Sequence, residues 1–244
     1  MTRVIEVDSV SKAFLLPHQR QTSIKELFLH PFRRADYERH QALHEVSFTV
    51  ESGECFGVIG PNGGGKSTLL KILAGIYRAD AGSVRVLGNL SPFIELGVGF
   101  QPDLNARDNI RVNGTLLGLS SKEVQERFDE IVGFAELERF VDQKLKNYSS
   151  GMQVRLAFAI AIQVPFDVLL LDEVLAVGDQ AFQEKCFDTF DRFRDEGKSI
   201  VLVSHDLASI GNYCDRTLLL QNGMCTAIGP THEVIELYEH HQRV

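Results

Sequence analysis

A glycine-rich loop that ends in a lysine and a serine is the segment of this chain best suited to chemistry. Residues 60–67 read Gly-Pro-Asn-Gly-Gly-Gly-Lys-Ser, which fits the spacing G-x-x-x-x-G-K-[ST]. Glycines let successive N–H groups point inward at oxygen atoms, and a following helix adds the positive end of its dipole. Lys66 would reach the β- and γ-phosphates of ATP, and the Ser67 hydroxyl would ligate Mg²⁺. The predicted nucleotide contacts here are Gly60, Pro61, Asn62, Gly63, Gly64, Gly65, Lys66, Ser67 and Thr68.

Two carboxylates end a hydrophobic run further along the chain. Residues 168–171 are Val-Leu-Leu-Leu, and Asp172 and Glu173 follow directly. Ligands bind at the carboxyl ends of strands in open parallel sheets, so Asp172 would orient Mg²⁺ and Glu173 would be the general base for an attacking water. Many strands end at solvated acids, so this interpretation depends on the glycine loop in the same chain.

A short polar stretch precedes a long apolar run. Residues 148–152 read Tyr-Ser-Ser-Gly-Met. Serines and a glycine at a helix start offer hydroxyls and free N–H groups to an anion. An ordinary serine N-cap is the alternative, and the stretch taken alone favours it.

The hydrophobic pattern predicts the elements that position these residues. An apolar strand at Cys55–Ile59 precedes the glycine loop, and a helix over residues 67–74 follows it. Apolar strands at 168–171 and Ser199–Val203 indicate a buried parallel sheet. The helix between them would turn inward Phe182, Cys186, Phe187, Phe190 and Phe193. Alternation at residues 4–7 and 46–50 predicts an antiparallel layer.

Residues from about 104 to 164 are mostly helical in pattern. Ser120 and Glu123 would form a capping box, and residues 154–164 are apolar nearly all round, which predicts a buried helix. We therefore predict one α/β domain, residues 1–244, with a mostly parallel core sheet, an antiparallel β layer and a helical subdomain. An insert at about 17–42 carries Ile24, Leu27 and Phe28 at helical spacing. It would contact a membrane-embedded partner or lipid headgroups, or simply pack on its own domain.

Composition excludes some classes of function. The net charge of −8 argues against general nucleic-acid binding. No run approaches the ~18 apolar residues of a membrane span, and the first residues lack a signal-peptide pattern, so we expect a cytosolic chain. The four cysteines have no metal-ligand spacing and are expected to be reduced core thiols: Cys55, Cys186, Cys214 and Cys225.

The order of these motifs resembles that of the ABC ATPase family over nearly the whole chain. Residues 60–68 resemble its Walker A loop, and residues 169–173 resemble Walker B with the catalytic glutamate. Residues 148–152 resemble the signature motif, although Ser150 and Met152 replace a glycine and the glutamine of L-S-G-G-Q.

Three further positions match the family. Gln101 resembles the Q-loop glutamine, residues 177–179 the D-loop, and His205 the H-loop histidine. Phe14 fits the aromatic that stacks on adenine, with a core phenylalanine as the alternative. The resemblance implies a fold of the P-loop NTPase type, a metal site of Ser67, Gln101 and Asp172, and catalysis by Glu173, His205 and Lys66.

The resemblance also implies that one chain holds two half-sites. In this family the signature residues, here Ser149, Ser150 and Gly151, face the γ-phosphate of ATP bound to a second copy. His205 would position that phosphate and the attacking water, and Gln101 would contact the nucleotide and metal and relay the change to a membrane partner.

Four stretches resemble the polysaccharide-export branch of the family, namely residues 95–100, 148–152, 155–158 and 172–179. This implies a peripheral subunit at the cytoplasmic face of the inner membrane, paired with itself and with two copies of a transmembrane permease. It would drive export of lipid-linked O-antigen, with teichoic acid or capsule as alternatives, and would not bind nucleic acid. The competing classes are a soluble ABC ATPase that acts on nucleic acid or ribosomes, and a small-molecule P-loop kinase.

Overall fold

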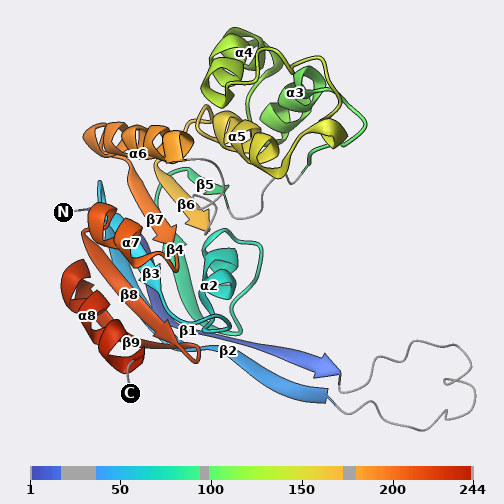
Figure 1. Ribbon diagram of the computed structural model, residues 1–244. Coiled ribbons are helices and arrows are strands. Elements are labelled where there is room, and N and C mark those ends of the chain that lie inside the picture. Colours follow the sequence, from blue (N-terminus) through green and yellow to red (C-terminus); the bar gives the residue numbers. More distant parts are fainter. Residues whose placement is uncertain (1, 18–36, 94–98, 173–179, 243–244) are drawn as a thin grey trace, which may run out of the picture.

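Two β-sheets enclose one helix, and further helices cover the outer face of the larger sheet. The computed structural model describes residues 2–17, 37–93, 99–172 and 180–242 of the 244-residue chain. Helix α2 (Lys66–Leu73) lies between the sheets, and a lobe of helices stands above the larger sheet in Figure 1.

The larger sheet has six strands in the order β5-β6-β7-β3-β8-β9. All neighbours are parallel except β8 and β9, which are antiparallel. The bounds are β3 Cys55–Ile59, β5 Leu90–Phe93, β6 Val168–Asp172, β7 Ser199–Val203, β8 Arg216–Gln221 and β9 Met224–Pro230. Every residue of β3 and β7 is buried, because α2 and the smaller sheet cover one face and further helices cover the other. The predicted, mostly parallel core sheet is confirmed.

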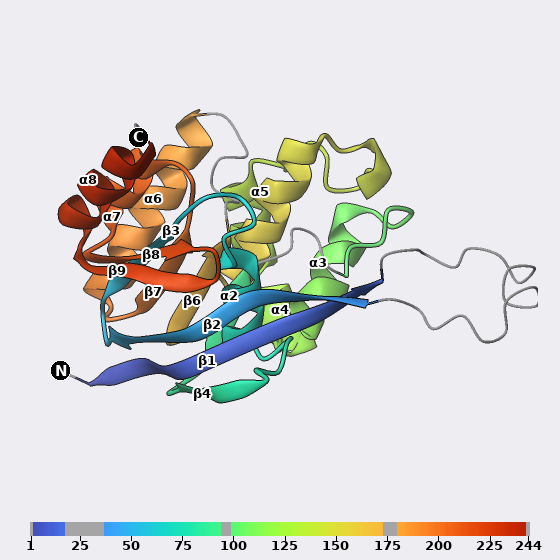
Figure 2. The ribbon, with the colours of Figure 1, turned by 90° about the horizontal axis from the view of Figure 1, so that it is seen from below.

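The smaller sheet is antiparallel, with the order β2-β1-β4. Its strands are β1 (Arg3–Pro17), β2 (Tyr37–Glu51) and β4 (Ala81–Val86), which confirms the predicted antiparallel layer. Figure 2 shows the three strands side by side, with β1 in the middle. Residues 37–42, at the end of the expected insert, belong to β2. The three apolar residues of the expected insert, Ile24, Leu27 and Phe28, lie outside the described residues.

The two faces of the six-stranded sheet belong to different hydrophobic cores. Val168 and Leu170 of β6 pack with α2 and with the antiparallel sheet. Leu169 and Leu171 point to the opposite face. That face is covered by α5 (Ser150–Ala161), α6 (Gln180–Asp195), α7 (Leu207–Tyr213) and α8 (Thr231–Gln242). Successive residues of β6 therefore point to opposite faces of the sheet, and α2 and α5 pack on these opposite faces.

Helix α6 buries most of the side chains expected to point inward. Phe182, Cys186, Phe190 and Phe193 are buried. Phe187 is only partly buried and stacks on Tyr213 with ring centroids 3.9 Å apart.

The helical lobe consists of α3 (Ala106–Leu116), α4 (Ser121–Ala135), a 3-10 turn η1 (Leu145–Asn147) and α5. The predicted capping box is present, since the Ser120 hydroxyl accepts from the Glu123 N–H and the Glu123 carboxylate accepts from the Ser120 N–H. Helix α5 is buried nearly all round, as expected. It joins the lobe to the sheet because its residues divide between two cores, with Val154, Ala157, Phe158 and Ala161 against the sheet and Leu156, Ala159 and Ile160 in the lobe.

The cysteines are core thiols, as the sequence predicts. Cys55, Cys186 and Cys214 are buried, Cys225 is partly buried, and all four are free. Burial raises the pKa of the Cys186 thiol to about 12, so it stays neutral near pH 7.

Within the described ranges, no helix combines the length and the apolar character that crossing a membrane requires.

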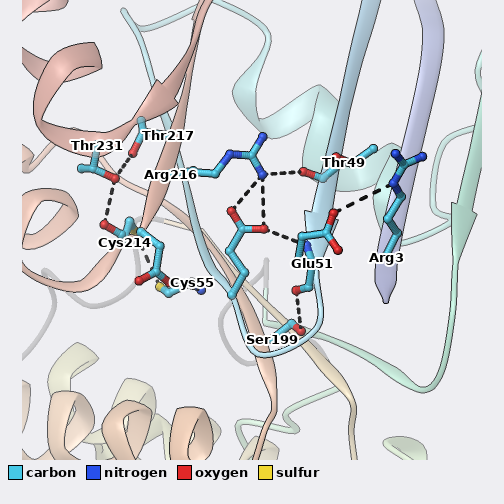
Figure 3. Close-up of polar contacts among 11 residues, drawn as sticks. Arg3, Thr49, Glu51, Cys55, Ser199, Cys214, Arg216, Thr217 and Thr231 are labelled. Carbon is cyan, nitrogen blue, oxygen red and sulfur yellow. Dashed lines mark hydrogen bonds and ion pairs between the residues drawn. The ribbon is translucent and has the colours of Figure 1, made fainter. Parts of the chain in front are cut away.

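A partly buried ion pair joins the two sheets at the end of the molecule where β3 begins. Arg216 of β8 donates to both carboxylate oxygens of Glu54, at 3.1 and 3.4 Å, and to the carbonyl of Thr49 (Figure 3). The same carboxylate accepts from the Glu51 N–H at 2.7 Å. The Glu54 side chain is 9% exposed, so its charge depends on these partners.

We expect Arg216→Met to lower the free energy of unfolding by about 2 kcal/mol, because Glu54 would lose its cation while remaining buried. Urea unfolding would measure the loss. Adding Glu54→Gln should recover at least half of it by removing the unpaired charge. If Arg216→Met alone unfolded at the same urea midpoint as the parent chain, this account would be contradicted.

Candidate functional site

Three motifs that are distant in the sequence lie at the same edge of the core sheet, each at or just after the carboxyl end of a strand. Val203 of β7 pairs with Val58 of β3 on one side and with Asp172 of β6 on the other. The carboxyl ends of these strands are therefore level, and His205 follows Val203 by two residues. The glycine loop, Asp172 and His205 thus meet where parallel sheets bind their ligands. Glu173 and the D-loop residues 177–179 lie outside the described residues.

The loop at 60–65 can curl only because of its glycines. Gly60 has a φ of 147°, and a Cβ there would come within 2.0 Å of the Leu220 carbonyl oxygen. Gly65 has a φ of 105°, and its Cβ would lie 2.6 Å from the Ala42 oxygen. The loop is thus pressed between β2 and β8, and any side chain at either glycine would displace it.

The charged end of Lys66 is held by the loop that precedes it. The residue is 6% exposed, and its Nζ donates to the carbonyls of Gly60 at 2.8 Å and Pro61 at 3.1 Å. Gly65 precedes α2, and no side chain in the described part of the chain caps that helix. The N–H groups of its first turn and the Lys66 ammonium therefore form a site suited to phosphate.

A cavity of about 260 Å³ opens beside this loop. Its lining residues are Phe14, His40, Ala42, Asn62, Gly63, Gly65, Lys66, Ser67 and Thr68. Phe14 of β1 lies opposite His40 of β2 in the sheet register, so both side chains project from one face. The Phe14 and Tyr77 rings pack edge to face, with centroids 5.5 Å apart. An aromatic wall next to a phosphate loop suits a purine base.

His40 and Ala42 were not identified from the sequence. Both fall in the stretch expected as an insert, and neither belongs to a recognisable motif. Only the pairing of β1 with β2 places them beside the glycine loop, so the nearest signal in the sequence was Phe14 itself.

We expect Phe14→Ala to weaken ATP binding about tenfold, because a stacked base contributes ~1–3 kcal/mol. Phe14→Trp should retain binding, since it keeps an aromatic face. The neighbouring Leu15, which is 68% exposed, supplies the control variant Leu15→Ala. Titration with a fluorescent ATP analogue would measure all three, and an unchanged affinity in Phe14→Ala would make Phe14 a structural residue.

The signature-like stretch begins α5 on the far face of the sheet. The Ser149 hydroxyl caps that helix by accepting from the Met152 N–H at 3.2 Å. Ser149 and Ser150 are exposed, and Gly151 is partly buried. Because α2 and α5 lie on opposite faces of the core sheet, the structure does not gather these residues around the chain's own cavity.

Gln101 is exposed to solvent, but its backbone is held by a buried side chain. Its N–H donates to the Oδ1 of Asn109 at 2.7 Å. Asn109 is fully buried in α3 and has no motif to mark it, so sequence reasoning missed it.

His205 stands exposed between β7 and α7. The next residue, Asp206, caps α7 by accepting from the Ala208 N–H at 3.1 Å. A hydrogen bond from Ser209 is the main cause that lowers the pKa of Asp206 below its usual value. The carboxylate therefore stays ionised and holds the turn that carries His205.

The residues expected to bind metal offer only oxygen donors. Ser67 supplies a hydroxyl, Asp172 a carboxylate and Gln101 an amide oxygen, which are the ligand types that Mg²⁺ prefers. Among the described residues, no group of three or more His, Cys, Asp or Glu could hold a metal ion.

Comparison with known sequences agrees with this geometry. The ABC transporter family model matches residues 43–176. The O-antigen export system ATP-binding protein RfbB of Klebsiella pneumoniae is 42% identical over 242 residues, 98% of each chain. The teichoic acids export ATP-binding protein TagH of Bacillus anthracis is 36% identical over 98% of this chain but only 43% of its own length.

Solved structures show the same fold. An ATP-binding subunit of an ABC transporter superimposes with a TM-score of 0.76 at 22% identity, covering 97% of this chain and 93% of the other. A dimeric ATP-binding cassette with bound ADP and phosphate gives a TM-score of 0.75 at 22% identity, covering 93% and 98%.

Proposed function

The chain belongs to the ABC transporter family of ATPases, and we propose that its ATP hydrolysis powers the export of lipid-linked polysaccharide, O-antigen foremost. The observation that carries this proposal is the similarity to RfbB across 98% of both chains, with the glycine loop, Asp172 and His205 at one sheet edge. Teichoic-acid export is the second candidate, supported by the similarity to TagH.

The nucleotide would lie in the cavity beside the glycine loop. Phe14 would stack on the adenine base, and Lys66 with the N–H groups of residues 63–68 would hold the phosphates. When bound, Mg²⁺ neutralises charge on the β- and γ-phosphates. Ser67, Gln101 and Asp172 are the residues that would hold it.

Hydrolysis would need two further side chains, one from the residue after β6 and one from the segment after β7. Glu173, which directly follows β6, would accept a proton from the attacking water. His205 would donate a hydrogen bond to the γ-phosphate and keep the water in line.

A second copy of the chain would complete each site. Because α5 and α2 lie on opposite faces of the core sheet, Ser149, Ser150 and Gly151 would serve the nucleotide held by the partner. Triphosphate charge would draw the two copies together, and its cleavage would let them separate.

The membrane partner would be a permease present in two copies. The ATPase would sit on it as a peripheral subunit at the cytoplasmic face of the inner membrane. It would meet the lipid-linked glycan only through the permease, and it would not bind nucleic acid, in keeping with its net charge of −8.

Two measurements test this function. If the site needs two chains, the ATPase rate should rise with the square of protein concentration when the chain is dilute; a rate proportional to concentration would contradict the dimer. In vesicles that contain the permease, lipid-linked O-antigen should stimulate hydrolysis more than lipid-linked teichoic acid. The reverse order would favour the second candidate.

A further inference from the structure

One buried side chain engages the whole backbone of Gln101. Asn109 is 0% exposed, and its Oδ1 accepts the Gln101 N–H at 2.7 Å. Its Nδ2 donates to the Gln101 carbonyl at 3.1 Å, so the carboxamide pairs with that residue much as a neighbouring strand would. The Gln101 N–H needs an oxygen opposite it, which fixes the orientation of the Asn109 amide.

The same nitrogen also reaches the next part of the loop. The Asn109 Nδ2 lies 3.2 Å from the Leu104 carbonyl and 2.9 Å from that of Asn105, its own helical neighbour. A buried amide is costly unless it is hydrogen bonded, and here every polar atom of the side chain has a partner. An asparagine is buried at position 109 because its carboxamide satisfies the backbone groups of the loop that carries Gln101.

The loop held by Asn109 is joined in turn to the turn before the signature-like stretch. The Pro102 and Leu104 carbonyls each accept a backbone hydrogen bond at 2.9 Å, from Lys146 and Leu145 of η1 respectively. The Lys146 ammonium also pairs with Asp103 at 2.9 Å.

The connection continues to the start of α5. The Gln153 side chain donates to the carbonyls of Leu145 and Tyr148, both at 3.4 Å, and Ser149 follows directly. A chain of hydrogen bonds therefore runs from Gln101 through Asn109 and Leu104 to the helix that carries Ser149.

We propose that Asn109 is a positioning residue, which fixes the Gln101 backbone to the helical lobe so that Gln101 and Ser149 move together. The Gln101 side chain would contact the nucleotide and the metal, and Asn109 would fix the position of the backbone from which that side chain extends. The inference rests on the proposed role of Gln101 at the catalytic site.

A double-mutant cycle on the full chain tests this role. We expect Asn109→Ala to lower the ATPase rate by about 10–100-fold, the effect typical of residues that orient a metal ligand. If Asn109 acts through Gln101, the same change made in Gln101→Ala should lower the rate by less than about twofold further. ATP-analogue affinity, which depends on the glycine loop, should stay within about twofold of the parent chain.

A control variant separates positioning from loss of stability. Ser120→Ala removes the capping box of α4 in the same lobe, at a cost of about 1 kcal/mol, without touching Gln101. It should lower the urea midpoint but leave the ATPase rate near that of the parent chain. If it slowed hydrolysis as much as Asn109→Ala, the effect would be one of stability and the inference would be overturned.

The outcomes distinguish this inference from the proposed function. Suppose that Gln101→Ala hydrolyses ATP slowly and that adding Asn109→Ala slows it a further tenfold. This result would overturn the positioning role of Asn109 but leave the role of Gln101 intact. A Gln101→Ala variant with the parent ATPase rate would overturn the role of Gln101 and the inference with it.

Hydrogen exchange on the unaltered chain supplies a second test if Asn109→Ala does not fold. The Gln101 amide should exchange as slowly as the amides of α3, since its N–H is donated to a buried oxygen. Exchange at the rate of an unprotected loop would overturn the inference.

Discussion

Replacing Glu173 with glutamine is expected to slow ATP hydrolysis by about 10²–10⁴-fold while leaving ATP bound. Glu173 directly follows Asp172 in the sequence, and Asp172 is the last residue of β6, at the sheet edge where the glycine loop and His205 also lie. The amide has the shape of the carboxylate but cannot accept the proton of the attacking water. With ATP uncleaved, the two copies should remain together.

Phosphate release would measure the loss of turnover, and light scattering during gel filtration with ATP and Mg²⁺ would detect the lasting dimer. Glu196→Gln makes the same change at an exposed carboxylate beyond α6, and it should keep the parent rate. Turnover in Glu173→Gln within a few fold of the parent chain would remove Glu173 from the role of base.

Replacing Lys66 with alanine should weaken nucleotide binding by at least about 30-fold, because truncating one partner of a buried, charged hydrogen-bonded pair costs ~2–5 kcal/mol. The loop would be affected as well. The Lys66 ammonium donates to the carbonyls of Gly60 and Pro61, so its loss would leave both without that partner and loosen the curl.

Lys122→Ala is the matched control for this change. Lys122 lies on α4, and its side chain is 85% exposed, so removing it should alter neither affinity nor rate. Titration with a fluorescent ATP analogue compares the variants. Tight nucleotide binding by Lys66→Ala would mean that the phosphates lie elsewhere than beside this loop.

The two variants separate the two halves of the proposed mechanism. Lys66→Ala should bind ATP weakly and so form little dimer, whereas Glu173→Gln should bind ATP and fail to hydrolyse it. A mixed dimer with one copy of each should hold ATP only at the site whose Lys66 is intact, and that ATP should stay uncleaved because Glu173 of the same chain has been replaced.

The sequence by itself determined the fold class and predicted which residues would face the phosphates. Buried parallel strands have continuous apolar runs, so β3, β6 and β7 were predicted within a residue of their observed ends. The glycine loop was recognisable because its chemistry depends on the positions of neighbours in the chain, namely a curl at Gly60 and Gly65 and a lysine directly after it. The capping box of α4 is local in the same way.

The tertiary structure alone decided the contacts between segments that are distant in the chain. His40 meets Phe14 only through the register of β1 and β2, and Asn109 meets Gln101 only because the loop that carries Gln101 packs against α3. Glu54 finds Arg216 across 162 positions of sequence. A buried polar side chain takes its meaning from whichever partner packing brings to it, and no spacing along the sequence encodes that partner.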